Sequence, residues 1–252
     1  MADFVLIGVS GKKQSGKSLL CDNIYDKYAI EGADITMYSF AQVLKRNVCI
    51  DVLGLTNEQC NGTDEQKNLE TIYTWDNLPE EVRLKNTNAW FVDGLGIITQ
   101  EEWDEKYGRE CFFDKSVPAL RIGQMTAREI MQVVGTDIFR QYFDDNIWVN
   151  ATLRQINKDK PKIALISDVR FPSEVDAVIN SGGYIVRLLR DVCKADPHES
   201  ETALDNYDFV SWGSRVCIVN NQKMSVEEKN HIVINYLNKI ITDVGRRDDE
   251  LT

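Results

Sequence analysis

One stretch near the start of the chain combines glycine, lysine and serine at a spacing that suits phosphate binding. Residues 11–18 read GKKQSGKS, which fits the pattern G-x-x-x-x-G-K-[ST]. The two glycines let the backbone turn without a Cβ in the way, so that its N–H groups point at phosphate oxygens. Lys17 would reach the β- and γ-phosphates of a nucleotide, and the Ser18 hydroxyl would ligate Mg²⁺. The residues expected to contact the nucleotide here are Gly11, Lys13, Ser15, Gly16, Lys17, Ser18 and Leu19.

The sequence on either side of this loop supports the interpretation. The apolar run at residues 5–9 predicts a strand before the loop, and residues 19–27 predict a helix after it. In that order, the positive end of the helix dipole faces the bound phosphates. We therefore predict that the chain binds a nucleoside triphosphate. The alternative is a glycine turn that carries a surface lysine.

Strand-like apolar runs alternate with helix-like runs along most of the chain. This alternation predicts an α/β fold of three layers, in which helices cover both faces of a parallel five-stranded sheet. The expected strands are residues 5–9, 35–40, 163–167, 184–189 and 216–219. The expected helices are residues 19–27, 41–53, 126–143, 146–157, 173–180 and 225–241, followed by a frayed tail at 245–252.

Residues 57–118 differ from the rest of the chain in composition. They are rich in Asn, Asp, Glu and Thr, but they also contain Trp75, Trp90 and Trp103. The tryptophans indicate a segment that folds, because disordered segments are poor in aromatic residues. We expect a mostly helical insertion that covers one side of the core, within a single domain formed by residues 1–252.

Ligands of open α/β sheets bind at the carboxyl ends of the strands. Asp168 comes directly after the strand predicted at 163–167. There it would contact Mg²⁺ directly or through water, or it would orient the attacking oxygen. The alternative is that it caps the helical region around Ser173. Arg170, two residues on, would neutralise phosphate charge.

The strand predicted at 184–189 leads into a polar loop, residues 190–204. Successive strand residues face opposite sides, so Arg187 and Arg190 should point in opposite directions, with only Arg190 at the functional end. A loop that begins with an arginine suits phosphoryl transfer, because such a loop can exclude water and bring positive charge to the transferred group. For His198 in this loop, a solvated histidine is favoured over a general base.

The last predicted strand ends before Asn220 and Asn221, whose side chains can hydrogen-bond a purine edge, and we assign this contact to Asn220. The sequence at this place reads NNQK, which lacks the Asn-Lys-x-Asp pattern of GTPases and so disfavours guanine-specific switching. The helix predicted at 126–143 has two faces at 100° per residue. One face suits a phosphate and a flat base, and a solvated helix face is the alternative. That face carries Arg128, Gln132, Gly135 and Phe139, and the apolar face carries Ile130, Val133 and Val134.

Composition narrows the class of protein. The formal net charge is −11, which disfavours sequence-independent binding of nucleic acid. The six cysteines form no CxxC pair, so reduced thiols are expected and a zinc site is not. The N-terminus lacks the basic region of a signal peptide, and no window reaches the ~18 apolar residues of a membrane span. We expect a cytoplasmic protein that binds neither a membrane nor nucleic acid directly.

Taken together, several runs resemble the deoxynucleoside monophosphate kinases of tailed bacteriophages. The resemblance covers most of the chain outside residues 57–118, and its most specific parts are GTD before an aromatic-rich helix and SDVRFPSE. The runs are the phosphate loop, SFAQVLKR, TAREIMQVVGTDIFRQYFDDNIWV, ISDVRFPSEVDAVINSGGYIVRLLRD and PHESE.

The resemblance implies a nucleoside monophosphate kinase fold and a homodimer. It also implies transfer of the γ-phosphoryl group from ATP, with Mg²⁺, to a deoxynucleoside monophosphate, which would serve phage DNA synthesis in the host cytoplasm. Lys17 and Ser18 would bind ATP–Mg²⁺. Asp168 and Arg170 would lie at the transfer centre, with Asp168 on the metal, and Arg190 in the lid loop. The residues expected around the monophosphate are Phe40, Lys45, Arg128, Gln132, Thr136 and Asp137.

Two other functions stay open at this point. One is a phosphate-loop kinase of another small acceptor, such as dephospho-coenzyme A. The other is a nucleotide-driven ATPase that acts on DNA, which the acidic composition disfavours.

Overall fold

The computed structural model describes residues 4–92, 96–107, 116–191 and 202–249. The chain divides into two compact units, of which the first consists of Met1–Leu44 and Phe139–Thr252 and the second of Lys45–Ile138. The insertion expected at 57–118 lies inside the second unit.

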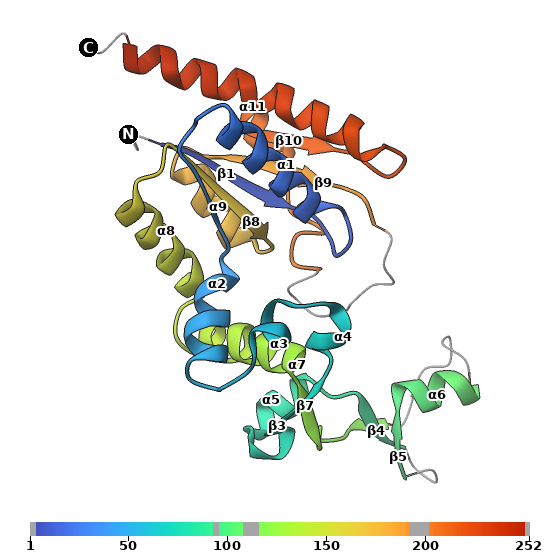
Figure 1. Cartoon of the computed structure of the whole chain (residues 1–252). Helices are drawn as coiled ribbons and strands as arrows, with labels where there is room; N and C mark the ends of the chain where they lie inside the picture. The colour runs from blue at the N-terminus through green and yellow to red at the C-terminus, as the bar shows by residue number, and fades with distance from the viewer. Residues whose placement is uncertain (1–3, 93–95, 108–115, 192–201, 250–252) are drawn as a thin grey trace. The chain divides into compact units, whose positions relative to one another are not determined.

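The first unit contains five parallel strands in the order β10-β9-β1-β8-β2 (Figure 1). Every residue of β1 is buried, as expected for a strand with helices on both faces. The predicted α/β fold with a five-stranded parallel sheet is therefore confirmed. The strands are β1 (Val5–Ser10), β2 (Ile35–Tyr38), β8 (Ile163–Val169), β9 (Tyr184–Leu188) and β10 (Val216–Val219).

Helices cover the two faces of this sheet. On one face, α1 and α11 share a buried core with alternate strand residues such as Ile7, Leu165 and Val186. On the other face lies α9, close to the β1 residue Gly8, where an added Cβ would come within 3.5 Å of Val178. The helices are α1 (Lys17–Ile30), α2 (Ala41–Val43), α8 (Ile147–Asp159), α9 (Pro172–Asn180) and α11 (Val226–Asp249), with a 3₁₀ helix, η4, at Val210–Arg215.

Helix α11 begins where the sequence predicts and ends later. The Glu228 N–H donates to the Ser225 hydroxyl (3.1 Å) and the Ser225 N–H to the Glu228 carboxylate (2.8 Å), which is the expected capping box. The frayed tail predicted at 245–252 is wrong in its first residues, because the helix continues to Asp249. One glycine, Gly245, costs a helix about 1 kcal/mol, which the rest of a helix of this length can offset.

The helices predicted at 41–53 and 126–143 change type along their length. After α2 the chain forms a π-helix, η1 (Leu44–Ile50), and after α7 (Ala127–Gln132) it forms another, η3 (Val133–Arg140). A π-helix bonds each residue to the fifth one along and so holds more residues per turn. The polar stripe assigned at 100° per residue therefore does not continue past Gln132. Both divisions between the two units fall inside these π-helical segments.

The second unit has helices, as expected for its inserted segment, and also two antiparallel sheets. One sheet pairs β3 with β7, and the other has the order β5-β4-β6. Trp75 is buried and Arg121 stacks over its ring, in agreement with a segment that folds. The strands are β3 (Glu70–Thr74), β4 (Ala89–Val92), β5 (Gly96–Thr99), β6 (Ser116–Pro118) and β7 (Gln124–Thr126). The helices are α3 (Asn57–Asn61), α4 (Asp64–Lys67), η2 (Trp75–Asn77), α5 (Glu80–Lys85) and α6 (Gln100–Tyr107), besides α7 and η1.

Candidate active site

The loop between β1 and α1 has a backbone that only particular residues can adopt. Gly16 has a φ of +90° and Gln14 a φ of +59°, both in the left-handed region. A Cβ at Gly11 would lie 2.6 Å from the Ser15 hydroxyl oxygen and 3.1 Å from the Leu188 Cβ. The glycines at the two fixed positions of the motif are therefore required by the shape of the loop.

Three buried donor atoms near this loop have no hydrogen-bond partner among the described residues. They are the Ser15 hydroxyl and the Nε atoms of Arg187 and Arg190. A buried donor without an acceptor costs free energy, roughly 1–3 kcal/mol. An anion bound at the loop would supply acceptors, so these donors fit a phosphate group.

The lysines of the loop make contacts within the first unit. The Lys17 ammonium donates to the carbonyl oxygens of Gly11 and, at 2.7 Å, of Lys12. Lys12 itself forms ion pairs with Asp191 (3.0 Å) and Asp205 (3.2 Å), and the hydrogen bond to Asp191 is the main cause that raises the pKa of Lys12. These two carboxylates lie on either side of residues 192–201, so most of the expected lid loop, with His198, lies outside the described residues. Ser18 and Leu19 are exposed, and Lys13 is half-buried.

Two buried side chains also hold this loop: Asn221, which was expected near a purine edge, and Lys229, which no motif marks. The Asn221 amide nitrogen donates to the Ser15 carbonyl oxygen at 2.9 Å, and the Asn221 amide oxygen accepts the Arg190 N–H at 2.9 Å. The Lys229 ammonium donates to the Gly16 carbonyl oxygen at 3.0 Å. The predicted base contact, Asn220, is by contrast exposed and accepts only a long hydrogen bond from the Gln222 N–H, at 3.5 Å, within the described residues.

The end of β8 contains an irregularity that sets the position of Asp168. Gly8 pairs with Ile166 but Ser10 pairs with Val169, so β8 has one extra residue at this place. Such a bulge turns a side chain away from the direction that regular alternation gives it. Asp168 therefore lies within the strand, one residue before its end, and not directly after it as predicted.

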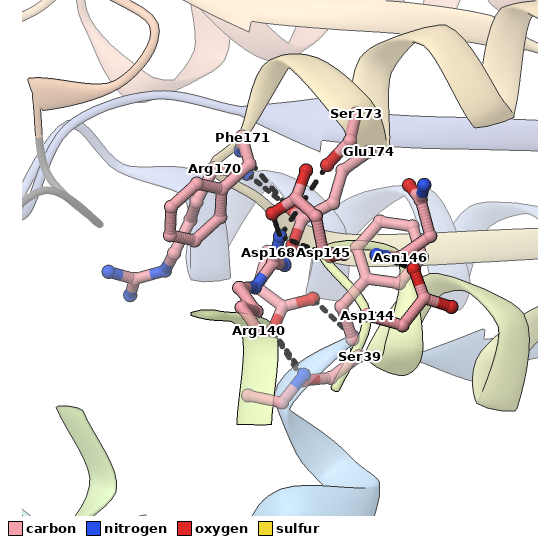
Figure 2. Close-up of polar contacts among 12 residues, drawn as sticks. Ser39, Arg140, Asp144, Asp145, Asn146, Asp168, Arg170, Phe171, Ser173 and Glu174 are labelled. Atoms are coloured by element: carbon pink, nitrogen blue, oxygen red, sulfur yellow. Dashed lines mark hydrogen bonds and ion pairs between the residues drawn. The ribbon is translucent and has the colours of Figure 1, made fainter. Parts of the chain in front are cut away.

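The Asp168 carboxylate is held by donors at the beginning of α2 (Figure 2). It accepts hydrogen bonds from the Ser39 hydroxyl (2.6 Å), the Phe40 N–H (2.7 Å) and the Ala41 N–H (3.0 Å). The capping alternative had placed this carboxylate near Ser173, whereas the structure shows it at the start of a different helix. The Phe40 ring is 2% exposed and packs in the core.

A second carboxylate, Glu174, lies in the same region and was not marked by the sequence. It accepts a hydrogen bond from the Arg140 guanidinium and from the N–H groups of Arg170 (2.6 Å) and Phe171 (3.1 Å). Arg140 also stacks over the Phe171 ring, 3.9 Å from its centroid. Burial, against the opposing effect of Arg140, raises the pKa of Glu174 to about 7, and the nearby Asp168 adds to the rise.

The predicted arginines occupy different surroundings. In Figure 2 the Arg170 side chain extends away from the pair formed by Arg140 and Glu174. Arg190 follows the end of β9 and is fixed through its backbone by Asn221. Only Arg190 was expected to lie at the functional end, but Arg187 pairs with Ser10, the last residue of β1, and donates to its hydroxyl at 2.9 Å. That expectation was wrong because of the register between β1 and β9. It places Arg187 opposite Ser10, at the carboxyl end of β1.

All the residues expected around an acceptor, except Phe40, belong to the second unit. Arg128 forms an ion pair with Asp64 (2.5 Å) and donates to Asn68 (3.0 Å). The Asp137 carboxylate is 1% exposed and is paired with Lys85 (2.7 Å) and Asn86 (2.7 Å). Lys45, Gln132 and Thr136 are half-buried.

Within the described residues there is no cluster of three or more His, Cys, Asp or Glu side chains that could hold a metal ion. Mg²⁺ commonly needs only one or two protein ligands besides phosphate oxygens and water. A hydroxyl oxygen and a carboxylate oxygen, as Ser18 and Asp168 offer, are suitable ligands for Mg²⁺. In the same part of the chain, no helix combines the length and the apolar character that a membrane span needs.

A family model and two viral proteins that resemble this chain all point to the same class of kinase. The sequence model of the family described as deoxynucleotide monophosphate kinase matches residues 5–229. A protein of Acanthamoeba polyphaga mimivirus, provisionally named as a deoxynucleotide monophosphate kinase, is 29% identical over 239 residues, which is 89% of this chain and 91% of the viral protein. The deoxynucleoside-5′-monophosphate kinase of Escherichia phage T5 is 28% identical over 181 residues, 68% of this chain and 70% of the phage protein.

Proposed function

The chain belongs to the deoxynucleotide monophosphate kinase family, and on this basis we propose that it transfers the γ-phosphoryl group of ATP to a deoxynucleoside 5′-monophosphate. As a member of this family it is a phosphotransferase. The observation that carries the proposal is the loop of residues 11–18, with its left-handed glycine and the buried donors beside it that have no partner in the described part of the chain. ATP, Mg²⁺ and the roles of single residues are the parts that we add to the family assignment.

The donor phosphates would bind to the loop's N–H groups and to Lys17. Lys17 has a flexible stem, so its ammonium can leave the Gly11 and Lys12 carbonyls and follow the transferred group. Ser18 and Asp168 would hold Mg²⁺, which neutralises phosphate charge when it is bound. Because Asp168 already accepts three hydrogen bonds, its contact with the metal fits a single remaining lone pair or an intervening water.

Arg170 and Arg190 would stabilise the negative charge that the transfer creates. Arg190 lies two residues after the end of β9, and its Nε donor has no partner among the described residues. Its N–H is fixed by Asn221, which also holds the phosphate loop. A preorganised cation of this kind acts mainly on the transition state.

The acceptor monophosphate would bind at Phe40, Lys45, Arg128, Gln132, Thr136 and Asp137. Arg128 can hold a phosphate with two parallel hydrogen bonds, which a lysine cannot do as well. To do so it must exchange its ion pair with Asp64, whose side chain is 41% exposed and therefore easily solvated. Asp137, a buried acceptor, suits a hydroxyl or amino group better than a phosphate.

The proposal extends to organisation and biological setting. We treat residues 1–252 as one kinase domain with the insertion 57–118 and the lid loop 190–204, acting as a homodimer. The viral relatives support a role in supplying deoxynucleotides for DNA synthesis in the cytoplasm of an infected cell.

A coupled assay of ADP formation tests the reaction directly. The purified chain is supplied with ATP, Mg²⁺ and one acceptor at a time from a panel of deoxy- and ribonucleoside monophosphates and dephospho-coenzyme A. We expect stoichiometric ADP only with deoxynucleoside monophosphates, and none for the Lys17→Met variant. ATP hydrolysis that is stimulated by DNA and needs no monophosphate would contradict the proposal in favour of a DNA-acting ATPase.

A further inference from the structure

Two consecutive carbonyl oxygens of the phosphate loop accept hydrogen bonds from buried side chains. The Ser15 oxygen accepts from the Asn221 amide nitrogen and the Gly16 oxygen from the Lys229 ammonium, at 2.9 and 3.0 Å. Asn221 and Lys229 are each 3% exposed. They lie more than 200 positions away in sequence, after β10 and in α11, so the last part of the first unit contacts its first loop.

The geometry of the peptide bond makes these contacts relevant to anion binding. In a trans peptide the C=O and the next residue's N–H point in opposite directions. Holding the Ser15 oxygen toward Asn221 therefore turns the Gly16 N–H to the other side. Holding the Gly16 oxygen toward Lys229 does the same for the Lys17 N–H.

The Gly16 oxygen also accepts the Leu20 N–H at 3.1 Å, as the first bond of α1. A carbonyl oxygen has two lone pairs, so the two donors are compatible. The helix bond alone directs the Lys17 N–H toward the end of α1 where anions bind, and Lys229 adds a second restraint in the same sense.

A buried ammonium at this place is not explained by stability. Burial lowers the pKa of Lys229, which shows that its charge is partly desolvated. Among the described residues, the acceptor of the Lys229 ammonium is the neutral Gly16 carbonyl oxygen, and a buried charge held in this way usually costs free energy relative to an apolar side chain of similar size. It does, however, bring positive charge close to the loop, and a Cβ at Gly16 would lie only 3.1 Å from it.

We propose that Asn221 and Lys229 are positioning residues, which orient the Gly16 and Lys17 N–H groups for the phosphates of the nucleotide donor. The inference rests on the proposed function, because it takes the loop of residues 11–18 as the donor site. Asn221 has a second part in this arrangement, because it also fixes the backbone of Arg190.

Calorimetric titration of the whole chain with ATP and with inorganic tripolyphosphate tests the inference. Lys229→Met and Asn221→Ala should each raise the Kd of both ligands about 10- to 100-fold, the loss expected for one well-placed hydrogen bond or charge. The Kd of the acceptor monophosphate should stay unchanged. Lys229→Arg should recover part of the loss, and Asn221→Ala should in addition lower kcat, because it releases Arg190.

Lys239→Met is the matched control, since Lys239 is an exposed lysine of the same helix. The midpoint of thermal unfolding separates positioning from folding, because Lys229→Met removes a desolvated charge and should leave Tm unchanged or raise it. Unchanged tripolyphosphate binding in folded Lys229→Met and Asn221→Ala would overturn the inference. So would an equal loss for donor and acceptor with a lowered Tm. If tripolyphosphate binding is instead indifferent to Lys17→Met, the proposed donor site itself fails.

Discussion

The carboxyl end of the parallel sheet has two sides that are built in opposite ways. After β1, β9 and β10, side-chain donors hold backbone oxygens, as Asn221 and Lys229 do for the phosphate loop. At the ends of β8 and β2, backbone donors hold side-chain carboxylates, as the N–H groups of Phe40 and Phe171 do for Asp168 and Glu174. The first side presents N–H groups and positive charge, and the second fixes negative charge.

The two sides also differ in how many of their polar groups are satisfied. Around the loop, three buried donors have no partner among the described residues. On the other side, Asp168 and Glu174 each accept three hydrogen bonds from described residues. The loop side is therefore organised for an anion that comes from outside, whereas the carboxylate side is already held in place. We expect changes at Lys17 and Arg190 on the loop side to affect mainly binding and turnover, and a change at Glu174 on the carboxylate side to affect mainly stability.

The largest effect is expected for Lys17→Met. It removes the one mobile charge that can follow the transferred phosphoryl group, so transfer should be abolished in the coupled assay. The thermal unfolding midpoint should stay near that of the unchanged chain, because Lys17 lies at the half-buried first residue of α1 and outside the apolar core. A folded variant with near-normal turnover would show that the loop of residues 11–18 does not bind the phosphate donor. The functional contrast between the two sides of the sheet would then be wrong.

Arg190→Ala should lower kcat roughly 10³-fold, with a smaller effect on the KM for ATP, because a cation at this place acts on transition-state charge. Arg187→Ala is the matched variant, at an arginine within β9. It should mainly lower stability, because Arg187 is buried, bonded to Ser10 and stacked near Phe209. The reverse outcome, with Arg187→Ala folded but inactive and Arg190→Ala silent, would exchange the two roles.

Arg128→Ala tests whether residues of the second unit bind the phosphate of the acceptor. The loss of a charge-assisted hydrogen bond, roughly 1.5–3 kcal/mol, predicts a decrease of about 10- to 150-fold in kcat/KM for the monophosphate. The KM for ATP should change little, and Arg128→Lys should recover part of the activity. If the loss is the same for donor and acceptor, the variant has damaged the fold. If there is no loss, another cation such as Lys45 holds the phosphate.

The smallest effect on turnover is expected for Glu174→Gln, whose influence should appear in the pH dependence of stability. Because the folded pKa of Glu174 is about 7, above the 4.5 of an ordinary glutamate, the folded chain binds this proton more tightly than the unfolded chain. The resulting contribution to stability is full below pH 4.5 and is lost as the pH rises to about 7, with a slope of up to about 1.4 kcal/mol per pH unit.

Urea unfolding of the unchanged chain and of Glu174→Gln between pH 4.5 and 8 measures this difference. The variant should lack that part of the slope, whatever its overall stability. Parallel curves would show that Glu174 is ionised throughout the range and would contradict the prediction.

The fold and the loop could be predicted because their signals are local. Apolar runs mark all five strands, and Thr126 and Ser225 mark helix starts through capping residues three positions away. Asn221 and Lys229 have no such signal, because they act on residues 206 and 213 positions away. The position of Asp168 depends on a bulge, which arises from the pairing of β1 with β8 and not from either strand alone.

The two π-helical segments are places where a homologous chain can lose one residue without disturbing the rest of the fold. Each holds more residues per turn than an α-helix, so deleting one residue from Leu44–Ile50 or Val133–Arg140 lets the remainder close as α-helical turns. A deletion in the middle of α1 would instead rotate every later side chain of that helix by about 100° relative to the core. Homologues that are one residue shorter should therefore have their alignment gaps in these two segments.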